Sequence, residues 1–407
     1  MKSSFLHTKL NPSERDILTN RILSFSKTLW LIGVLSVVIL SFDSEARTVS
    51  IDVDSRKGVG LIPAFWQGIA PSGEDGIPRD RVTWERIEPA MILASWRERI
   101  GGGGPGWYAL NQAIDAAGKG GRRVILTLPV AGAPGDEDAW RKRVEDTVRR
   151  TFKRVDRYEI SAEGVEDLGR FLRYYESGAW AAYQGHHKAK IGGPGGDWTR
   201  ELIKPFIRLC VERSLPLNFV SWHVAVRNVT DPLDAYHRVE SAIDAVAPSQ
   251  RPEALVSKWG LAEDVTDPVY LTCGALRHLL ATELIAACVD PLTTAWAAPA
   301  FKAFGELGGV QIPMTVSDEG VSGVATMEGD AVMLLLWRRN DTGPIEADLS
   351  LSGMRWGRAY DYERVMIQAG DKNRRVVERK SLRAVDPLVL SFSIPAGQAT
   401  LIRIVPE

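Results

Sequence analysis

The sequence has few of the features that assign a function directly. It contains three cysteines in 407 residues, an odd and sparse set that excludes a disulfide framework. The formal net charge is -1 and no long basic run occurs, which argues against a nucleic-acid partner, because such proteins need a basic face. No GxGxxG follows the first predicted strand, and GxxxxGK[ST] and HExxH are absent. We therefore predict no metal, no cofactor and no nucleic-acid partner.

Long apolar runs are also scarce, and the one strongly apolar run covers residues 29–42. Its 14 residues are fewer than the roughly 20 that a membrane-spanning helix needs. A mostly basic flank precedes it and Ser44-Glu45-Ala46 follows it, the pattern of a secretory signal peptide. We predict that residues 1–46 are a signal peptide or an N-terminal anchor. The protein is then secreted or faces the periplasm or cell envelope, with membrane contact only if this segment is retained.

Short apolar runs alternate with amphipathic stretches between residues 59 and 308. Strands are predicted at residues 61–68, 81–86, 123–129, 157–163, 189–194, 217–223, 254–259 and 292–297, and helices at 138–155, 165–180, 198–214, 232–247 and 272–287. This alternation predicts an α/β fold with a parallel sheet, and its length suits a (β/α)8 TIM barrel. A doubly wound open sheet is the alternative. The cysteines Cys210, Cys273 and Cys288 lie in apolar helical surroundings and are predicted to be core residues.

The pattern changes after residue 308. Short alternating runs, separated by turns and with no helix between them, predict an antiparallel β-sandwich over residues 309–407; they cover residues 321–326, 331–337, 346–351, 359–364, 388–394 and 400–405. Residues 47–58 include a β-branched alternating run and are expected to add a strand to this sandwich.

Polar and aromatic residues stand at successive strand ends of the predicted barrel. Because active sites of such barrels lie at the carboxyl ends of the strands, these side chains are expected to converge over one mouth. They are Glu163 after the fourth strand, Ser221, Trp222 and His223 at the end of the sixth, and Lys258 and Trp259 at the end of the seventh. Glu159 shares the parity of Glu163 and is expected to point into the barrel, as part of a structural ion pair.

These strand ends resemble glycoside hydrolase family 39, the β-xylosidase and α-iduronidase type. That family shows a Trp-Glu-x-Gly-Asn-Glu-Pro-like end to its fourth strand, Gly-Gly-Pro after the fifth, Ser-x-His after the sixth and a Thr-Glu-Trp-like end to the seventh. Residues 158–164, 192–194, 221–223 and 257–259 take these places in order, and the resemblance covers most of residues 48–407. It implies a barrel with a glycosidic cleft, a β-sandwich beside it, and retaining hydrolysis of O-glycosyl bonds.

The sequence departs from the family at the residues that would carry the reaction. By motif, the acid/base position falls on Glu163 and the nucleophile position on Lys258, while Ala162 and Gly164 replace the Asn and Pro around the acid/base. Retaining hydrolysis needs two carboxylates about 5 Å apart, and an ammonium cannot form the glycosyl ester. It also favours an ionised Glu163, whereas a general acid must be protonated. The resemblance thus implies a divergent, degenerate glycosidase that binds an oligo- or polysaccharide at the mouth.

Two alternatives stay open. An active glycosidase would use Glu163 with a non-standard partner such as Glu263, Asp264 or Asp197, although each also suits a solvated loop or a helix cap. A non-enzymatic scaffold would leave the mouth idle. The rings of Trp222, Trp259 and Trp66 either stack on sugar faces or pack between barrel and loops. Ser221, His223 and the Ala162 position would contact the sugar.

Overall fold

The structure is a computed structural model. It describes residues 47–407 apart from 59, 62–67, 70–83, 88–104, 134, 166, 197–201, 246–250, 290–296, 341–342, 344, 355–356, 371–374 and 384. The predicted signal peptide, Trp66 and Asp197 therefore lie outside the described residues.

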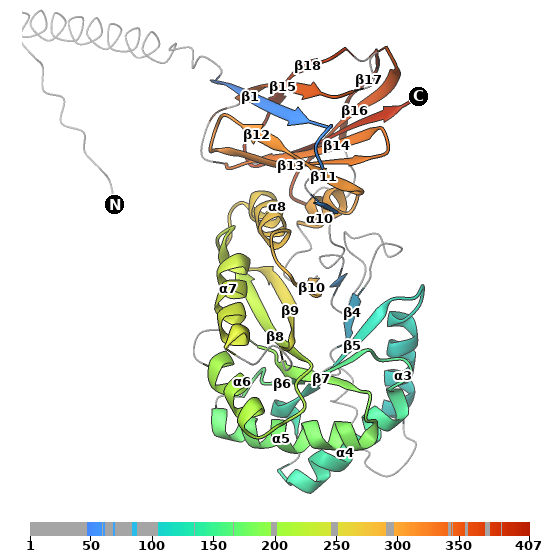
Figure 1. Ribbon diagram of the computed structural model, residues 1–407, viewed down its shortest axis with the longest axis vertical. Helices are drawn as coiled ribbons and strands as arrows, with labels where there is room; N and C mark the ends of the chain where they lie inside the picture. Colours follow the sequence, from blue (N-terminus) through green and yellow to red (C-terminus); the bar gives the residue numbers. More distant parts are fainter. Residues whose placement is uncertain are drawn as a thin grey trace, which may run out of the picture. The chain divides into compact units, whose positions relative to one another are not determined.

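A parallel sheet forms the first module (Figure 1). Its strands pair in the order β10-β3-β4-β5-β6-β7-β8-β9, and β10 pairs with both β9 and β3, which closes the sheet into a barrel. The strands are β3 (Gly68–Ile69), β4 (Trp84–Ile87), β5 (Arg123–Pro129), β6 (Arg157–Ser161), β7 (Lys190–Pro194), β8 (Phe219–Val226), β9 (Glu253–Leu261) and β10 (Ala286–Val289). The predicted α/β class and parallel sheet are confirmed. The connection from β3 to β4 lies outside the described residues.

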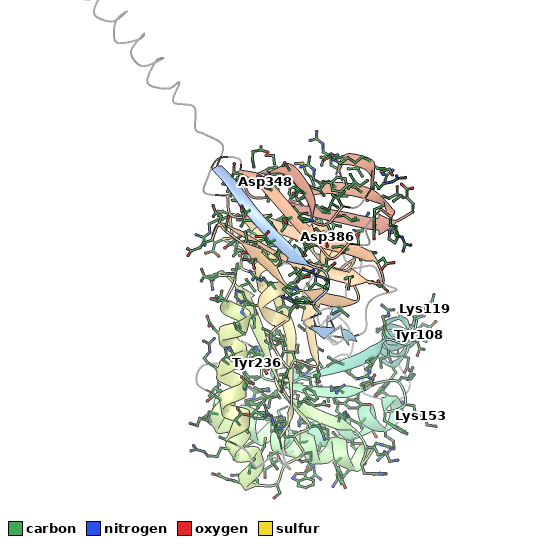
Figure 2. All side chains as sticks on the ribbon, turned by 45° about the horizontal axis from the view of Figure 1, so that its top comes forward. Tyr108, Lys119, Lys153, Tyr236, Asp348 and Asp386 are labelled. Atoms are coloured by element: carbon green, nitrogen blue, oxygen red, sulfur yellow. The ribbon has the colours of Figure 1, made fainter. Side chains whose placement is uncertain are left out.

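Helices follow the later strands in turn. They are α3 (Pro105–Ala117), α4 (Glu137–Thr151), α5 (Leu168–Gly185), α6 (Ile203–Glu212), α7 (Asp231–Asp244), α8 (Pro268–Leu279) and α10 (Ala298–Phe304). Helix α4 buries Trp140, Val144 and Val148 at helical spacing while its basic residues face away from the core, as the sequence predicted. Tyr108 on α3 points into solvent and is 67% exposed (Figure 2).

Alternation along the strands produces two separate cores. Phe219 and Leu255 point to the barrel interior, where they pack with Ile125, Ala286 and Cys288. Residues of the opposite parity, such as Val220 and Val256, join the larger core between strands and helices. The direction of a side chain at the mouth therefore follows from its parity relative to Phe219 or Leu255.

Two antiparallel sheets form the second module. One has the order β12-β1-β15-β18 and the other β17-β16-β19-β14-β13-β11-β2. Their strands are β1 (Arg47–Asp54), β2 (Gly60–Leu61), β11 (Val310–Ile312), β12 (Met314–Val316), β13 (Val321–Glu328), β14 (Ala331–Arg338), β15 (Ile345–Ser352), β16 (Ala359–Ile367), β17 (Arg375–Arg383), β18 (Leu388–Ile394) and β19 (Ala399–Pro406). The antiparallel second module is confirmed, and a shared apolar core lies between its sheets.

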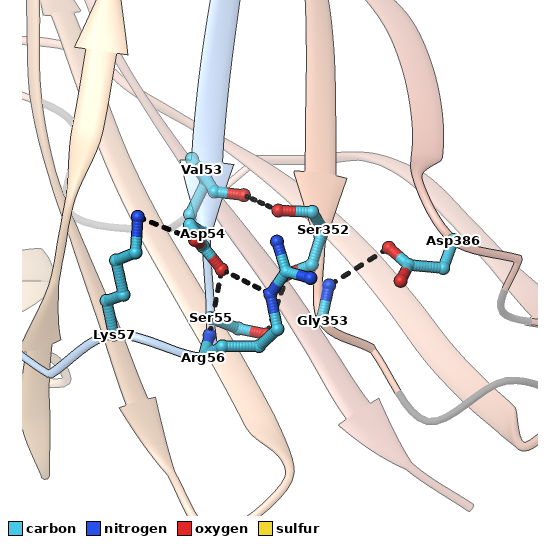
Figure 3. Close-up of polar contacts among 8 residues, drawn as sticks. All are labelled: Val53, Asp54, Ser55, Arg56, Lys57, Ser352, Gly353 and Asp386. Atoms are coloured by element: carbon cyan, nitrogen blue, oxygen red, sulfur yellow. Dashed lines mark hydrogen bonds and ion pairs between the residues drawn. The ribbon is translucent and has the colours of Figure 1, made fainter.

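Strand β1 joins this module from the far end of the sequence, as predicted for residues 47–58. It pairs with β12 and is fastened at its carboxyl end to β15, where Ser55 Oγ donates to the Ser352 carbonyl at 2.8 Å (Figure 3). Asp54 accepts from Arg56 and faces Lys57 at 3.4 Å. The Arg56 hydrogen bond is the main cause that lowers the pKa of Asp54 to about 2.

Direct contacts join the two modules. The Phe304 ring of α10 lies 6.0 Å from the Trp337 ring of β14, between centroids. Beside them, Arg403 of β19 pairs with both Glu306 and Glu363. Asn340 N–H donates to Asp267 at the start of α8. The outer face of the larger antiparallel sheet therefore packs on the helices after β9 and β10.

Two predicted elements were placed wrongly. The last barrel strand, β10, begins at Ala286 within the predicted helix 272–287 and ends beyond it at Val289, because its run Ala-Ala-Cys-Val suits either structure. The predicted strand 292–297 falls almost wholly outside the described residues. One strand was expected at residues 61–68, but the structure has two strands there. Strand β2 pairs with β11 of the antiparallel module, and only β3 belongs to the barrel.

The cysteines are core residues, as predicted. All three are buried. Burial is the main cause that raises the pKa of the Cys210 and Cys273 thiols far above their ordinary range, so these two remain protonated and unreactive. In the part of the chain that the structure describes, no helix is both long and apolar enough to cross a membrane.

Candidate functional site at the barrel mouth

Glu163 lies in the turn that ends β6. Ala162 N–H donates to the Pro194 carbonyl at 2.6 Å, which ties this turn to the end of β7. Glu163 N–H donates to Ser161 Oγ at 3.1 Å, and the Glu163 side chain is 45% exposed. The fully buried Ala162 side chain is not available to a ligand, so its expected sugar contact is wrong.

Gly164 determines the backbone conformation of this turn. Its φ is 71°, in the left-handed region, whereas proline is fixed near about −65°. The Pro that family 39 carries at this position is therefore incompatible with the turn found here. The departure from the family motif thus changes the backbone after Glu163 as well as a side chain.

A β-bulge in β9 turns Lys258 into the mouth. Trp222 is in register with Val256, but His223 is in register with Lys258, so β9 has one extra residue, Ser257, at this point. Strict alternation from the inward Leu255 would place Lys258 outward. The bulge shifts the parity, and Lys258 reaches the same face as Leu255 instead.

Lys258 and Glu163 meet across the mouth. Lys258 Nζ lies 3.3 Å from Glu163 Oε1, a hydrogen-bonded ion pair between β9 and the end of β6. The predicted salt-bridge contact between these two side chains is confirmed. Lys258 is 26% exposed, so both charged groups remain open to solvent.

His223 and Ser221 share the inward face of β8 with Phe219. His223 is in register with Lys258, is 7% exposed, and its N–H donates to the Gly196 carbonyl. Ser221 is fully buried, and its hydroxyl has no hydrogen-bond partner among the described residues. His223 thus lies at the level of the ion pair. Ser221 lies one layer deeper and, contrary to expectation, is closed to a ligand in this conformation.

The tryptophans do not form a platform. Trp222 and Trp259 are both fully buried in the core between strands and helices, and the Trp259 ring lies 5.3 Å from that of Phe301 in α10. The expectation that these two rings stack on a sugar is wrong, and the packing alternative holds. The cause is parity, because residues on either side of the inward His223 and Lys258 point outward.

Glu159 is a buried carboxylate beneath the mouth. It points inward as predicted, is fully buried, and accepts a hydrogen bond from Thr127 Oγ1 at 3.0 Å. A side chain at Gly195 would touch it, since a Cβ there would lie 2.8 Å from Glu159 Oε1. Close backbone approach at Gly195 is therefore part of how this carboxylate is enclosed.

The alternative acids after β9 lie on the outer rim. Glu263 and Asp264 are exposed in the turn that follows β9, and Asp264 Oδ1 faces Arg227 Nε at 3.7 Å. Among the described residues, no group of three or more His, Cys, Asp or Glu side chains could hold a metal ion.

No protein-family model matches the chain, and no curated protein matches it. Similarity appears among solved structures. A monomeric β-xylosidase from Caulobacter crescentus CB15 is 14% identical with a TM-score of 0.69, over 89% of this chain and 100% of that one. A family 39 enzyme from Xanthomonas axonopodis pv. citri is 12% identical with a TM-score of 0.68, over 88% and 97%.

A xyloglucanase of glycoside hydrolase family 44 from Paenibacillus polymyxa is also similar. It is 12% identical with a TM-score of 0.63, over 88% of this chain and 100% of that one. At such identities the likeness shows the fold alone. The chain has a glycoside hydrolase-like fold.

Proposed function

We propose that this chain is an exported, divergent member of glycoside hydrolase family 39 that binds an oligo- or polysaccharide at the mouth of a (β/α)8 barrel and has lost retaining hydrolysis. The barrel would span residues 59–308 and the β-sandwich residues 309–407, with residues 1–46 directing export. The observation that carries the proposal is the ion pair of Lys258 and Glu163.

This pair occupies the place where a retaining glycosidase needs two carboxylates. Two carboxyl groups about 5 Å apart flank the bond in such enzymes, one as acid and one as nucleophile. Here the second group is an ammonium, which offers no oxygen to the anomeric carbon and repels positive charge developing there.

The carbohydrate ligand is inferred from the fold and from what remains at the mouth. The similar structures are named as a β-xylosidase and a xyloglucanase, which supports a sugar polymer as the ligand class. Glu163, Lys258 and His223 supply acceptors and donors at three strand ends, which suits hydroxyl groups. This makes binding without cleavage the function that the site supports best.

The test is a glycan array on residues 47–407, followed by calorimetry on the best ligand. Wild type is expected to bind a plant- or bacterial-type oligosaccharide, and Glu163→Gln and Lys258→Met are each expected to weaken binding about tenfold, since hydrogen bonds to charged groups are the strong ones. Cleaved product from wild type would instead establish an active glycosidase. Absence of binding across the array would support the scaffold alternative.

A further inference from the structure

A cavity lies on the rim, beyond the mouth. Its volume is about 440 Å³, within the range of ligand pockets. It is lined by the loops after β8 and β9, the first turn of α8, and Arg339 from the loop after β14. The cavity is thus built by both modules, and none of the mouth residues Glu163, Lys258 and His223 lines it.

Arg339 is held at the cavity by the aromatic ring beneath it. Its guanidinium carbon lies 5.4 Å from the centroid of the Tyr270 ring, and Nη2 donates to the Tyr270 hydroxyl at 3.4 Å. The neighbouring Asn340 N–H donates to Asp267 Oδ2 at 3.0 Å, while Asp267 Oδ1 accepts from Tyr270 N–H. Asp267 therefore uses its carboxylate to fasten the loop after β14 to the first turn of α8.

Arg227 faces the cavity from the other side. Its backbone is fixed, because Asp231 Oδ2 accepts from both Arg227 N–H at 2.6 Å and Asn228 N–H at 2.7 Å. Its side chain is 64% exposed, and Arg227 Nε lies 3.7 Å from Asp264 Oδ1, whose side chain is 75% exposed. An ion pair this long and exposed contributes little, so a ligand anion can replace Asp264 at low cost.

We infer that this rim cavity binds the carboxylate of an acidic sugar unit, such as a uronate, within the polysaccharide held at the mouth. Planar guanidinium groups match a carboxylate with paired hydrogen bonds, and two of them, Arg227 and Arg339, line this one cavity. The Tyr270 hydroxyl adds a donor for a sugar oxygen. This inference rests on the proposed carbohydrate-binding function and names the class of sugar.

The mouth and the cavity lie along the same two strands. Beyond the register of His223 with Lys258, β8 and β9 stay paired as far as Val226 with Leu261, and Arg227 follows at once. Four residues of strand separate His223 from Arg227, about 13 Å at the rise of a parallel strand. One oligosaccharide can therefore reach from the ion pair to the cavity, with its acidic unit on the side of the β-sandwich.

The test uses trimers of galacturonate, glucuronate and mannuronate, each also as its fully methyl-esterified form. The ester keeps the sugar and removes the charge. Wild type is expected to bind at least one acid trimer about tenfold more tightly than its ester by calorimetry, since a charge-assisted pair is being removed. Arg227→Gln and Arg339→Gln should each erase most of that preference, and Arg339→Lys should lose part of it.

Arg213→Gln is the matched control, because Arg213 pairs with Glu176 on the outer helices, is 55% exposed and is remote from the cavity lining. Equal binding of acid and ester, no binding of any trimer, or an unchanged preference in the arginine variants would overturn the inference. Lys258→Met separates the two proposals. If Lys258→Met weakens binding of acid and ester alike while the arginine variants leave the preference for the acid unchanged, the mouth binds sugar and the cavity does not, whereas if only the arginine variants act, the proposed mouth function fails.

Discussion

Strands β6 and β9 carry an ion pair at each end of the barrel, and the two pairs differ. At the amino-terminal ends, Arg157 of β6 pairs with Glu253 of β9 at 2.5 Å, and the Arg157 side chain is only 3% exposed. At the carboxyl ends, Glu163 and Lys258 pair at 3.3 Å with 45% and 26% exposed. The cation is on β6 at one end and on β9 at the other.

The difference separates stability from function. A buried charge without its partner destabilises the fold, so the Arg157 pair must be kept for the barrel to stay folded. A pair open to solvent contributes little to stability, so the Glu163–Lys258 pair is not needed to hold the barrel together, and we propose that it binds a ligand instead. The carboxyl-terminal end of such barrels is also where ligands are bound.

The largest effect is expected from Arg157→Met. Removing this buried cation leaves Glu253 without its main partner and should lower the free energy of unfolding by about 3 kcal/mol, the lower end for breaking a buried pair because Glu253 retains contact with water. Urea denaturation monitored by circular dichroism measures it. If Arg157→Met lowered the free energy of unfolding by less than Lys258→Met does, the proposed difference between the two ion pairs would be wrong.

Lys258→Met should change the free energy of unfolding by less than about 1 kcal/mol, because the pair at the mouth is partly solvated. Glu163→Gln should behave in the same way, and the double variant should show little further change. The same urea titrations test this. A loss above roughly 2 kcal/mol, the scale of a buried contact, would mean that the mouth pair is structural.

Glu253 should make the stability contribution of the Arg157–Glu253 pair sensitive to acid. Burial acts to raise its pKa, but the hydrogen bond and charge of Arg157, together with Lys190, outweigh burial and hold the pKa below its ordinary value of 4.5. Its stabilising contribution is therefore present above pH 4.5 and is lost as the pH falls below that value. In Glu253→Gln, the fall in unfolding free energy on acidification should be smaller than in wild type. The difference should be less than about 1 kcal/mol, because the Glu253 side chain is partly exposed, and urea midpoints measured across pH test it.

The smallest effect on stability is expected at the carboxyl end of β1, where Ser55 is hydrogen-bonded to Ser352 of β15. Because the pKa of Asp54 is lowered to about 2, mainly by Arg56, its contribution is present above pH 3.8 and disappears as the pH falls through about 2. The protection of Ser55 N–H against hydrogen exchange, relative to the intrinsic amide rate at each pH, should fall over this interval, because this N–H is bonded to the Ser352 carbonyl. Asp54→Asn should reduce the pH dependence of this protection. The same pH profile in wild type and Asp54→Asn would show that Asp54 does not stabilise the contact between β1 and β15.

Much of the fold could be predicted because its strands are apolar or alternating. Strand β5 and strand β18 were placed at their observed residues by such patterns. Strand β17 was missed because it is an edge strand whose charged residues, such as Arg379 and Lys380, face solvent and show no apolar period. Strand β10 was missed because four small apolar residues carry no period.

The site was predicted in part, and the misses have two causes, side-chain parity along the strands and a contribution from a distant part of the chain. The pairing of Glu163 with Lys258 followed from motif resemblance, since simple alternation from Leu255 would have turned Lys258 outward. The bulge at Ser257 has no signature in the sequence. Burial of Trp222 and Trp259 follows from the same parity, and the rim cavity depends on Arg339 from another module, which no local pattern reveals.

The central claim is that Lys258 stands where an attacking carboxylate would be. The direct measurement is the rate of aryl β-xyloside hydrolysis by Lys258→Glu, beside wild type and Lys258→Met. We predict no turnover above the uncatalysed background by wild type or Lys258→Met, and a rate for Lys258→Glu about 100-fold above that background, the lower end of what a positioned catalytic group supplies. Turnover by wild type equal to that of Lys258→Glu would contradict the account.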